Sequence, residues 1–168
     1  EVHRNEWERQ RLLTTAMLRA VPNVRPGAVV VLTGVSRDPD PFSDNMWFEG
    51  AVRLAYPGKD VDGMYFYSGY GVPPGANLKA DGGRWRWDGS GFPPLLADAA
   101  VADTVVIHYD GNGRAHVVPS LPPQICRGSC DTSAYHPEAV VAGSLNPIAV
   151  RRYRLDAGSR QAARTTAR

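Results

Sequence analysis

The sequence has no apolar run that approaches the roughly 20 residues needed to cross a bilayer, so we expect no membrane span within it. Its 168 residues are 43% hydrophobic and 21% charged, which fits one globular domain with a single core. The 14 prolines and 17 glycines exclude a helical bundle but fall short of a disordered or collagen-like composition. Lysine is scarce, with only Lys59 and Lys79 among 19 basic residues, a bias typical of a GC-rich genome.

The net charge of +2 is unevenly distributed along the chain. Residues 151–168 hold six arginines and one acid, Asp156, which leaves residues 1–150 with a net charge of −3. A nucleic-acid-binding domain carries its basic excess on the folded body, where it neutralises phosphates. We therefore expect no nucleic-acid partner, and we predict one domain at 1–157 followed by a basic, disordered tail at 158–168.

Two cysteines, Cys126 and Cys130, are separated by three residues in a stretch rich in proline, glycine and serine. This spacing lets the chain curl back and favours a local disulfide, which would stabilise the fold by about 1–2 kcal/mol through loop entropy. Free thiols, and half of a zinc site with His136, are the alternatives. A disulfide would indicate an oxidising compartment outside the cytoplasm.

Hydrophobic periodicity predicts helices and strands that alternate along the chain. Apolar residues recur at helical spacing in two segments, the first capped by Asn5, and a valine-rich run between them predicts a strand buried on both faces. The sequence Arg84-Trp85-Arg86-Trp87 has the period of a strand, which places both tryptophans on one face. The predicted elements are helices at 5–20 and 46–55, and strands at 28–35, 63–68, 84–88, 104–109, 114–118 and 148–155.

Turn-forming residues connect these elements. Asp110-Gly111-Asn112-Gly113 lies between two strand-like segments and predicts a β-hairpin. An acidic group at 38–44 lacks the ligand order of a calcium loop and is explained by turns and helix caps. Segments 69–83 and 119–137 are predicted loops. The order of elements predicts an α/β (or α+β) fold: a mixed β-sheet with two main helices packed against it, one β-hairpin and long Gly/Pro-rich loops.

Aromatic residues are concentrated between residues 65 and 87, together with two arginines. Such a group can stack on sugar rings or fill a core, and the sequence leaves both interpretations open. For the carbohydrate interpretation, the candidate ligand-binding residues are Tyr67, Tyr70, Trp85 and Trp87. Trp7, by contrast, is expected to anchor the first helix to the sheet.

No catalytic motif is present in the sequence. His108 and His116 are expected to be cross-strand neighbours in the hairpin, but no motif places a serine or cysteine beside them. The order of residues does not bring together the acids available for glycoside hydrolysis, which are Glu49, Asp88, Asp98 and Asp103. Neither a dinucleotide-binding fingerprint nor a phosphate-binding loop occurs. We therefore expect no catalytic residue, no metal site and no cofactor.

Several short segments resemble a pattern found in larger proteins. They are Trp7-x-x-Gln10, Pro26-Gly27 before the valine run, Asp44-Asn45-Met46-Trp47, Ala55-Tyr56-Pro57-Gly58, and Val105 to Asp110 with Gly113 and Val117-Val118. Over roughly residues 5 to 122, the chain is similar to soluble extracytoplasmic regions of polytopic bacterial membrane proteins, including those like membrane glycosyltransferases of the dolichyl-phosphate-mannose-dependent type. In such proteins the catalytic acids lie in loops of the membrane portion, so the resemblance implies an accessory domain without chemistry of its own.

The chain starts at Glu1 without a methionine or a signal-peptide pattern, as expected for a segment of a longer protein. We expect a noncatalytic accessory domain of a multi-pass bacterial membrane protein, tethered to the membrane in the periplasm or at the cell surface. Its expected partners are the membrane-embedded remainder of the same polypeptide and a glycan, a lipid-linked donor or a partner protein. The alternatives are a small secreted carbohydrate-active hydrolase and a free carbohydrate-binding module.

Overall fold

The computed structural model describes residues 2–36, 40–42, 45–67, 78–87, 98–121, 132–144 and 147–153. Within these ranges the strands form a four-stranded sheet and a separate two-stranded sheet, with helices packed around them. In chain order the elements are α1 (Val2–Ala20), β1 (Val29–Val35), α2 (Asn45–Ala55), β2 (Asp62–Tyr67), β3 (Leu78–Asp81), β4 (Arg84–Trp87), the 3₁₀ helix η1 (Val101–Asp103), β5 (Thr104–Gly111), β6 (Arg114–Val117), the 3₁₀ helix η2 (Thr132–Ala134), α3 (Pro137–Val140) and α4 (Pro147–Tyr153).

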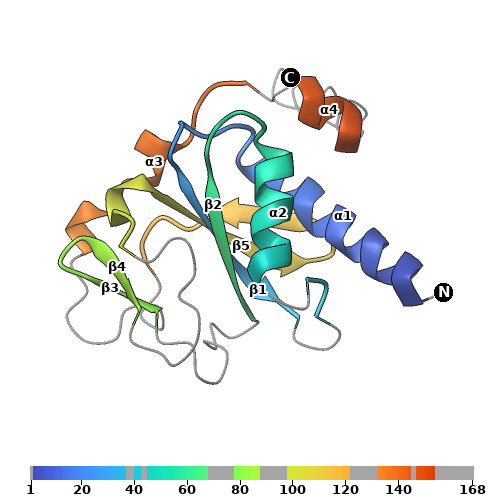
Figure 1. The fold of residues 1–168 in the computed structure, drawn as a ribbon, viewed down its shortest axis with the longest axis horizontal. Helices are drawn as coiled ribbons and strands as arrows, with labels where there is room; N and C mark the ends of the chain where they lie inside the picture. Colours follow the sequence, from blue (N-terminus) through green and yellow to red (C-terminus); the bar gives the residue numbers. More distant parts are fainter. Residues whose placement is uncertain are drawn as a thin grey trace, which may run out of the picture.

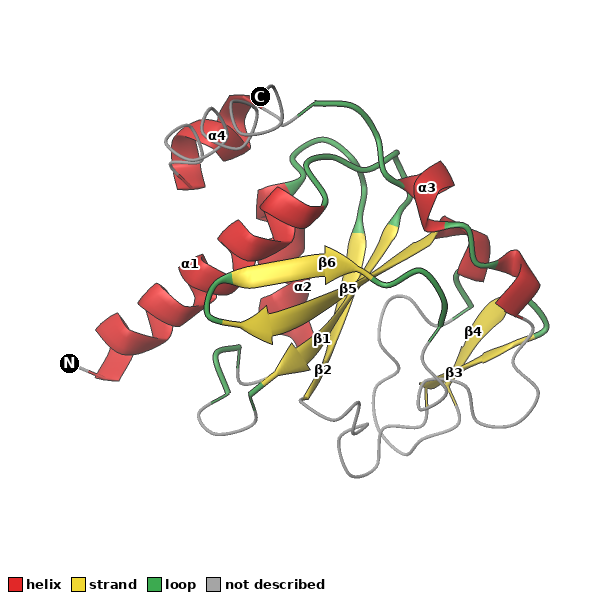
Figure 2. Ribbon diagram, turned by 180° about the vertical axis from the view of Figure 1, so that it is seen from behind, coloured by secondary structure: helices red, strands yellow, loops and turns green. Residues whose placement is uncertain are grey.

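Strand β1 is the central strand of the larger sheet. It pairs in parallel with β2 on one side and with β5 on the other (Figure 1), and β6 adds an antiparallel edge next to β5 (Figure 2). Every residue of β1 except Gly34 is buried, as the valine-rich run predicts. Because a parallel strand has side chains to bury on both faces, other elements must cover both sides of β1.

Helices α1 and α2 cover one face of the sheet, and Figure 2 shows both of them behind the strands. Phe48 and Val52 of α2 join Leu32 of β1 and Ile107 of β5 in one buried cluster, to which α1 also contributes. The opposite face buries a second cluster, in which Val31 and other strand residues meet the two-stranded sheet. The large sheet is therefore enclosed between a helical layer and a layer made by the β2 to β5 connection.

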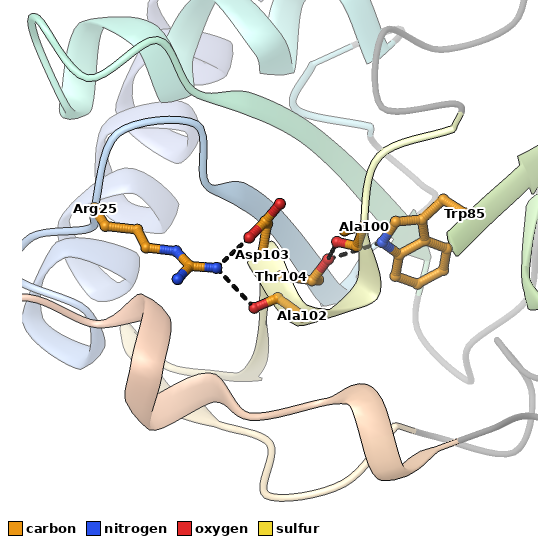
Figure 3. Close-up of polar contacts among 6 residues, drawn as sticks. All are labelled: Arg25, Trp85, Ala100, Ala102, Asp103 and Thr104. Atoms are coloured by element: carbon orange, nitrogen blue, oxygen red, sulfur yellow. Dashed lines mark hydrogen bonds and ion pairs between the residues drawn. The ribbon is translucent and has the colours of Figure 1, made fainter. Parts of the chain in front are cut away.

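Strands β3 and β4 form an antiparallel hairpin that covers this second face. Gly82 and Gly83 occupy its two-residue turn with φ of 55° and 74°, values that glycine adopts without strain. Trp85 of β4 is fully buried, and its indole N–H donates to the Thr104 hydroxyl at 2.8 Å (Figure 3). The Thr104 hydroxyl in turn donates to the Ala100 carbonyl at 3.3 Å. These bonds attach the hairpin to the beginning of β5.

Arg25 connects the turn after α1 to the same region. Its guanidinium donates to the Ala102 carbonyl at 3.0 Å and forms an ion pair with the Asp103 carboxylate (Figure 3). Both charged side chains are about 40% exposed, at 39% and 41%, so solvent weakens the pair. The contacts of Arg25 and the Trp85 bond therefore both hold residues 102–104, where the chain enters β5.

The predicted fold class is confirmed, with three local corrections. Segment 148–155 was expected to be a strand, but Pro147–Tyr153 is a helix, because proline suits a first helical turn and Ala149 and Tyr153 bury one helical face. Part of the predicted loop at 69–83 is β3, so the described residues include a second hairpin, β3–β4, besides the expected one. Asn5 lies inside α1, which begins at Val2, and is not its cap. The proposed tail at 158–168 lies outside the described residues.

Tyr135 bridges β5 and β6 where the two strands separate. Its hydroxyl accepts the Val106 N–H at 3.0 Å and donates to the Val118 carbonyl at 2.9 Å. The phenol thus replaces one direct backbone hydrogen bond between Val106 and Val118. The other direct bond, from the Val118 N–H to the Val106 carbonyl, is present beside it. Burial raises the pKa of Tyr135 to about 12, and the bond from the Val106 N–H partly offsets that effect.

Replacing Tyr135 with phenylalanine should lower the free energy of unfolding by about 1–3 kcal/mol, because the buried Val106 N–H and the half-buried Val118 carbonyl lose their partner. Chemical denaturation measures the change, and Tyr109→Phe, which removes a bond to the Gly113 N–H in the hairpin turn, should have a smaller effect.

Above pH 10 the phenol of Tyr135 ionises in the unfolded chain, while in the folded chain it keeps its proton up to about pH 12, so the native chain should lose stability over this interval. The Tyr135→Phe variant should lose less of its free energy of unfolding between pH 10 and about pH 12 than the native chain. An equal loss in both proteins would contradict the role of this phenol.

Candidate functional site

The carboxyl ends of β1 and β5 form a topological switch point. The chain leaves β1 toward α2 and β2 on one side, whereas β5 lies on the other side of β1 and continues into β6. In open sheets with parallel strands, ligands bind outside the carboxyl ends of strands that diverge in this way. We call this region, made of residues 33–36 and 108–110 with the facing residue His116, the carboxyl edge.

Four polar side chains meet at the carboxyl edge, and we call them the polar cluster: Thr33, His108, Asp110 and His116. The Thr33 hydroxyl lies 2.9 Å from Nδ1 of His108. His108 faces His116 across the hairpin, with ring centroids 5.6 Å apart, which confirms the expected cross-strand pair. Nδ1 of His116 lies 3.1 Å from the Asp110 carboxylate. The cluster therefore consists of two polar contacts, Thr33 with His108 and His116 with Asp110, joined by the facing imidazole rings.

Strand alternation places the polar cluster on the face away from the helices. Val31 and Val106, two residues before Thr33 and His108, belong to the cluster that packs against the β3–β4 hairpin. Leu32 and Ile107, which point the other way, pack against α1 and α2. The polar cluster thus continues the second face of the sheet beyond its apolar part.

Gly34 shapes the carboxyl edge. Its φ of 80° lies in the left-handed region, and the pairing of β1 with β2 is irregular between Leu32 and Val35. A Cβ atom at this position would lie 2.3 Å from the Tyr109 carbonyl oxygen and 2.9 Å from Cε1 of His108. Only glycine allows β1 to approach β5 so closely beside the polar cluster.

Aromatic packing supports the loop that follows β1 on the helical side. Tyr65 donates to the Asp40 carboxylate at 2.6 Å, and Asp40 also accepts the Phe42 N–H at 2.9 Å. The rings of Phe42, Phe48 and Tyr65 have centroids 5.0–5.5 Å apart. These contacts confirm a turn-forming role for Asp40; Asp38 and Asp44 lie outside the described residues.

The chemistry of the polar cluster suits binding better than nucleophilic catalysis. A hydroxyl beside an imidazole resembles a nucleophile with its base, but Thr33 is fully buried and its hydroxyl donates to the Ile107 carbonyl at 3.3 Å. The carboxylate of Asp110 contacts the other histidine, His116. The arrangement orients two imidazole rings, which can donate to and accept from a polar ligand.

Trp85, one of the four aromatic residues expected to bind a sugar, does not lie on the surface. Because this side chain is fully buried and hydrogen-bonded to Thr104, it presents no ring face to a sugar and belongs to the core. Arg84 and Arg86 point to the opposite, exposed side of β4, as the alternation predicts. Tyr67 is the last residue of β2 and Trp87 is the last residue of β4, and the structure describes only the backbone of both. Tyr70 lies outside the described residues.

The other sequence candidates do not converge. Asp98 pairs with Arg86 beside the small hairpin, and Asp103 pairs with Arg25 at the start of β5. Glu49 is largely buried in α2. Asp88, Cys126 and Cys130 lie outside the described residues, so the predicted disulfide stays a prediction. In the part of the chain that the structure describes, no group of three or more histidine, cysteine, aspartate or glutamate side chains is placed so that all could hold one metal ion.

A second surface feature escaped the sequence analysis, which treated apolar residues of the helices as core. Met46, Trp47 and Leu54 lie on the outward side of α2 and are 69%, 63% and 54% exposed, while Phe48 and Val52 face the sheet. We call these three residues the α2 stripe. Exposed apolar side chains on other helices are Trp7, Leu12 and Ile148, so Trp7, at 58% exposure, does not anchor α1 as expected.

Helix α4 lies beside the end of the α2 stripe. Arg152 donates to the Leu54 carbonyl at 3.3 Å, and Ile148 lies one helical turn before Arg152. No described helix is both long enough and apolar enough to cross a membrane.

No family model, no curated protein and no solved structure matches this chain.

A Gly34→Ala substitution should destabilise the chain by about 1–3 kcal/mol, because the new side chain meets the Tyr109 carbonyl in a strained backbone conformation. Thermal and chemical unfolding measure the loss, and NMR signals of the His108 ring should shift. Gly50→Ala is the matched control: Gly50 lies in α2 with open space around it, so alanine should stabilise the helix by up to about 1 kcal/mol. Equal stability of Gly34→Ala and the native chain would show that the edge tolerates a side chain here.

Proposed function

We propose that this chain is a noncatalytic, extracytoplasmic accessory domain of a multi-pass bacterial membrane protein, of the kind that includes membrane glycosyltransferases. In this proposal the α2 stripe packs against the membrane-embedded remainder of the same polypeptide. The carboxyl edge then contacts a glycan, a lipid-linked donor or a partner protein.

The α2 stripe is the observation that carries this proposal. Met46, Trp47 and Leu54 extend over two turns of one helix and are each more than half exposed. Exposed apolar patches of more than a few hundred Å² mark contacts with proteins or membranes, and three large apolar side chains on one side of a helix are a candidate for such a patch. Tryptophan and methionine are also enriched in the buried cores of protein interfaces.

Charged residues near the end of the α2 stripe support a location close to a membrane. Arg53 is exposed beside Leu54, and Arg151 and Arg152 are exposed on the adjoining helix α4. Arginine side chains next to exposed apolar residues favour contact with anionic lipid headgroups. Asp62 pairs with Arg53 at 3.1 Å and offsets part of this positive charge.

The two surface features lie on opposite sides of the large sheet. The α2 stripe is on the outer surface of the helical layer, whereas the polar cluster lies on the face covered by the β3–β4 hairpin. Contact through the α2 stripe therefore leaves the polar cluster accessible to a second molecule. This separation suits an accessory domain that is held on one side and binds on the other.

A photoreactive amino acid at position 47 of the full-length polypeptide tests the proposal. After illumination in membranes, position 47 should cross-link to transmembrane segments or their connecting loops, because the α2 stripe lies against them. Mass spectrometry of the cross-linked peptides identifies the partner. The encoded polypeptide should also contain apolar stretches of about 20 residues outside these 168 residues.

The same amino acid at position 114 serves as the control. Arg114 is exposed on β6, away from α2, and should cross-link to the membrane portion far less. Equal cross-linking from positions 47 and 114, or a gene without membrane spans, would overturn the proposal. The Met46→Ser, Leu54→Ser double variant should reduce cross-linking from position 47 yet change the free energy of unfolding by no more than about 1 kcal/mol.

A further inference from the structure

His108 and His116 stand opposite each other in the antiparallel pairing of β5 and β6. Their ring centroids are 5.6 Å apart, and both side chains lie on the face of the sheet away from α1 and α2. His116 is exposed and His108 is half-buried. Two imidazoles are thus held side by side on a rigid hairpin at the carboxyl edge.

In each of the two histidines, an oxygen atom of a neighbouring side chain lies within hydrogen-bond distance of Nδ1. The Asp110 carboxylate, which only accepts, lies 3.1 Å from Nδ1 of His116, so that nitrogen carries the hydrogen in this contact. The Thr33 hydroxyl lies 3.3 Å from the Ile107 carbonyl and 2.9 Å from Nδ1 of His108, so a hydrogen donated to Ile107 leaves its oxygen able to accept from Nδ1. In a neutral ring with hydrogen on Nδ1, the lone pair lies on Nε2.

These are the contacts that prepare histidine for a metal ion. A metal-binding histidine typically donates its other ring N–H to a carboxylate, a carbonyl or another oxygen, which fixes the tautomer and the ring orientation. Here both rings have such a partner, and the partners come from different strands: Thr33 from β1 and Asp110 from β5. The orientation of the pair therefore depends on the three-stranded pairing of β1, β5 and β6.

The ring separation also fits one shared ion. An ion about 2.0–2.1 Å from an imidazole nitrogen lies about 3.2 Å from the ring centroid, so two rings on one ion have centroids about 5–6 Å apart. The observed separation of 5.6 Å falls in this range before any metal is present. The carboxylate of Asp110 adds a negative charge that favours a cation nearby, and the exposed Arg114 opposes it.

We propose that Nε2 of His108 and Nε2 of His116 together bind one divalent transition-metal ion of the Cu²⁺, Ni²⁺ or Zn²⁺ class. Imidazole nitrogen suits these ions, and Cu²⁺ should bind most tightly. Since no third protein ligand converges on the pair among the described residues, water or an oxygen atom of a ligand fills the other coordination positions. This inference goes beyond the proposed function, because it concerns the opposite face of the sheet and does not depend on the α2 stripe.

Titration of the purified 168-residue chain with Ni²⁺ and Cu²⁺ tests the inference. The titration is carried out with the Cys126→Ser, Cys130→Ser variant so that thiolates cannot contribute. Calorimetry should give one ion per chain, and addition of diamagnetic Zn²⁺ should shift the Nε2 resonances of both His108 and His116 in NMR spectra. His116→Ala and His108→Ala should each weaken binding by about tenfold or more, and Asp110→Ala by about tenfold.

His136→Ala is the matched control, because His136 is an exposed histidine near a carboxylate but belongs to neither strand of the hairpin, with Nδ1 3.5 Å from Glu138. It should leave the affinity unchanged. His116 is exposed, so its variant should fold even if His108→Ala is destabilised. Unchanged affinity in His116→Ala, a shift of only one of the two rings, or an equal loss in His136→Ala would overturn the inference. A failure to detect cross-linking from position 47 would contradict the proposed function but would not affect the inference about the histidine pair.

Discussion

The structure depends on the burial of β1 between two parallel neighbours. A strand paired on both sides has its hydrogen-bonding groups satisfied within the sheet, but its valine side chains need cover on both faces. The helices supply that cover on one side and the β2 to β5 connection supplies it on the other. Trp85 and Tyr135 then fix the second layer by hydrogen bonds to Thr104 and to β5 and β6.

The same constraint decides where the functional surfaces lie. With both faces of β1 covered, polar side chains concentrate where the strands end, and Thr33 meets His108 at the carboxyl edge. The helical layer buries its inner side against the sheet, so its outer side is available for a partner, and the α2 stripe lies there. The proposed contact with a membrane protein therefore uses one layer, and the proposed ligand or metal binding uses the edge beyond the other.

The sequence predicted features that local chemistry specifies. Periodicity located β1, α1 and α2, and the Asn-Gly turn set the hairpin register that pairs His108 with His116, because a tight turn fixes which residues face each other. The contact of Thr33 with His108 joins parallel strands 75 residues apart, whose register no local turn determines. Alternation put both tryptophans of β4 on one face but did not reveal which face is buried, so Trp85 was a candidate for sugar binding. Ala149 and Tyr153 are four residues apart, a helical spacing, within a segment too short for periodicity to exclude a strand.

Native-state hydrogen exchange of the backbone amides tests most directly whether β1 is the structural centre. The amides of Val30, Val31 and Leu32, enclosed by β2 and β5, should exchange only through global unfolding and be the slowest in the described part of the chain. Amides of the two-stranded β3–β4 sheet should exchange faster through local opening. Exchange of the β1 amides at the rate of β3 and β4 would contradict the account.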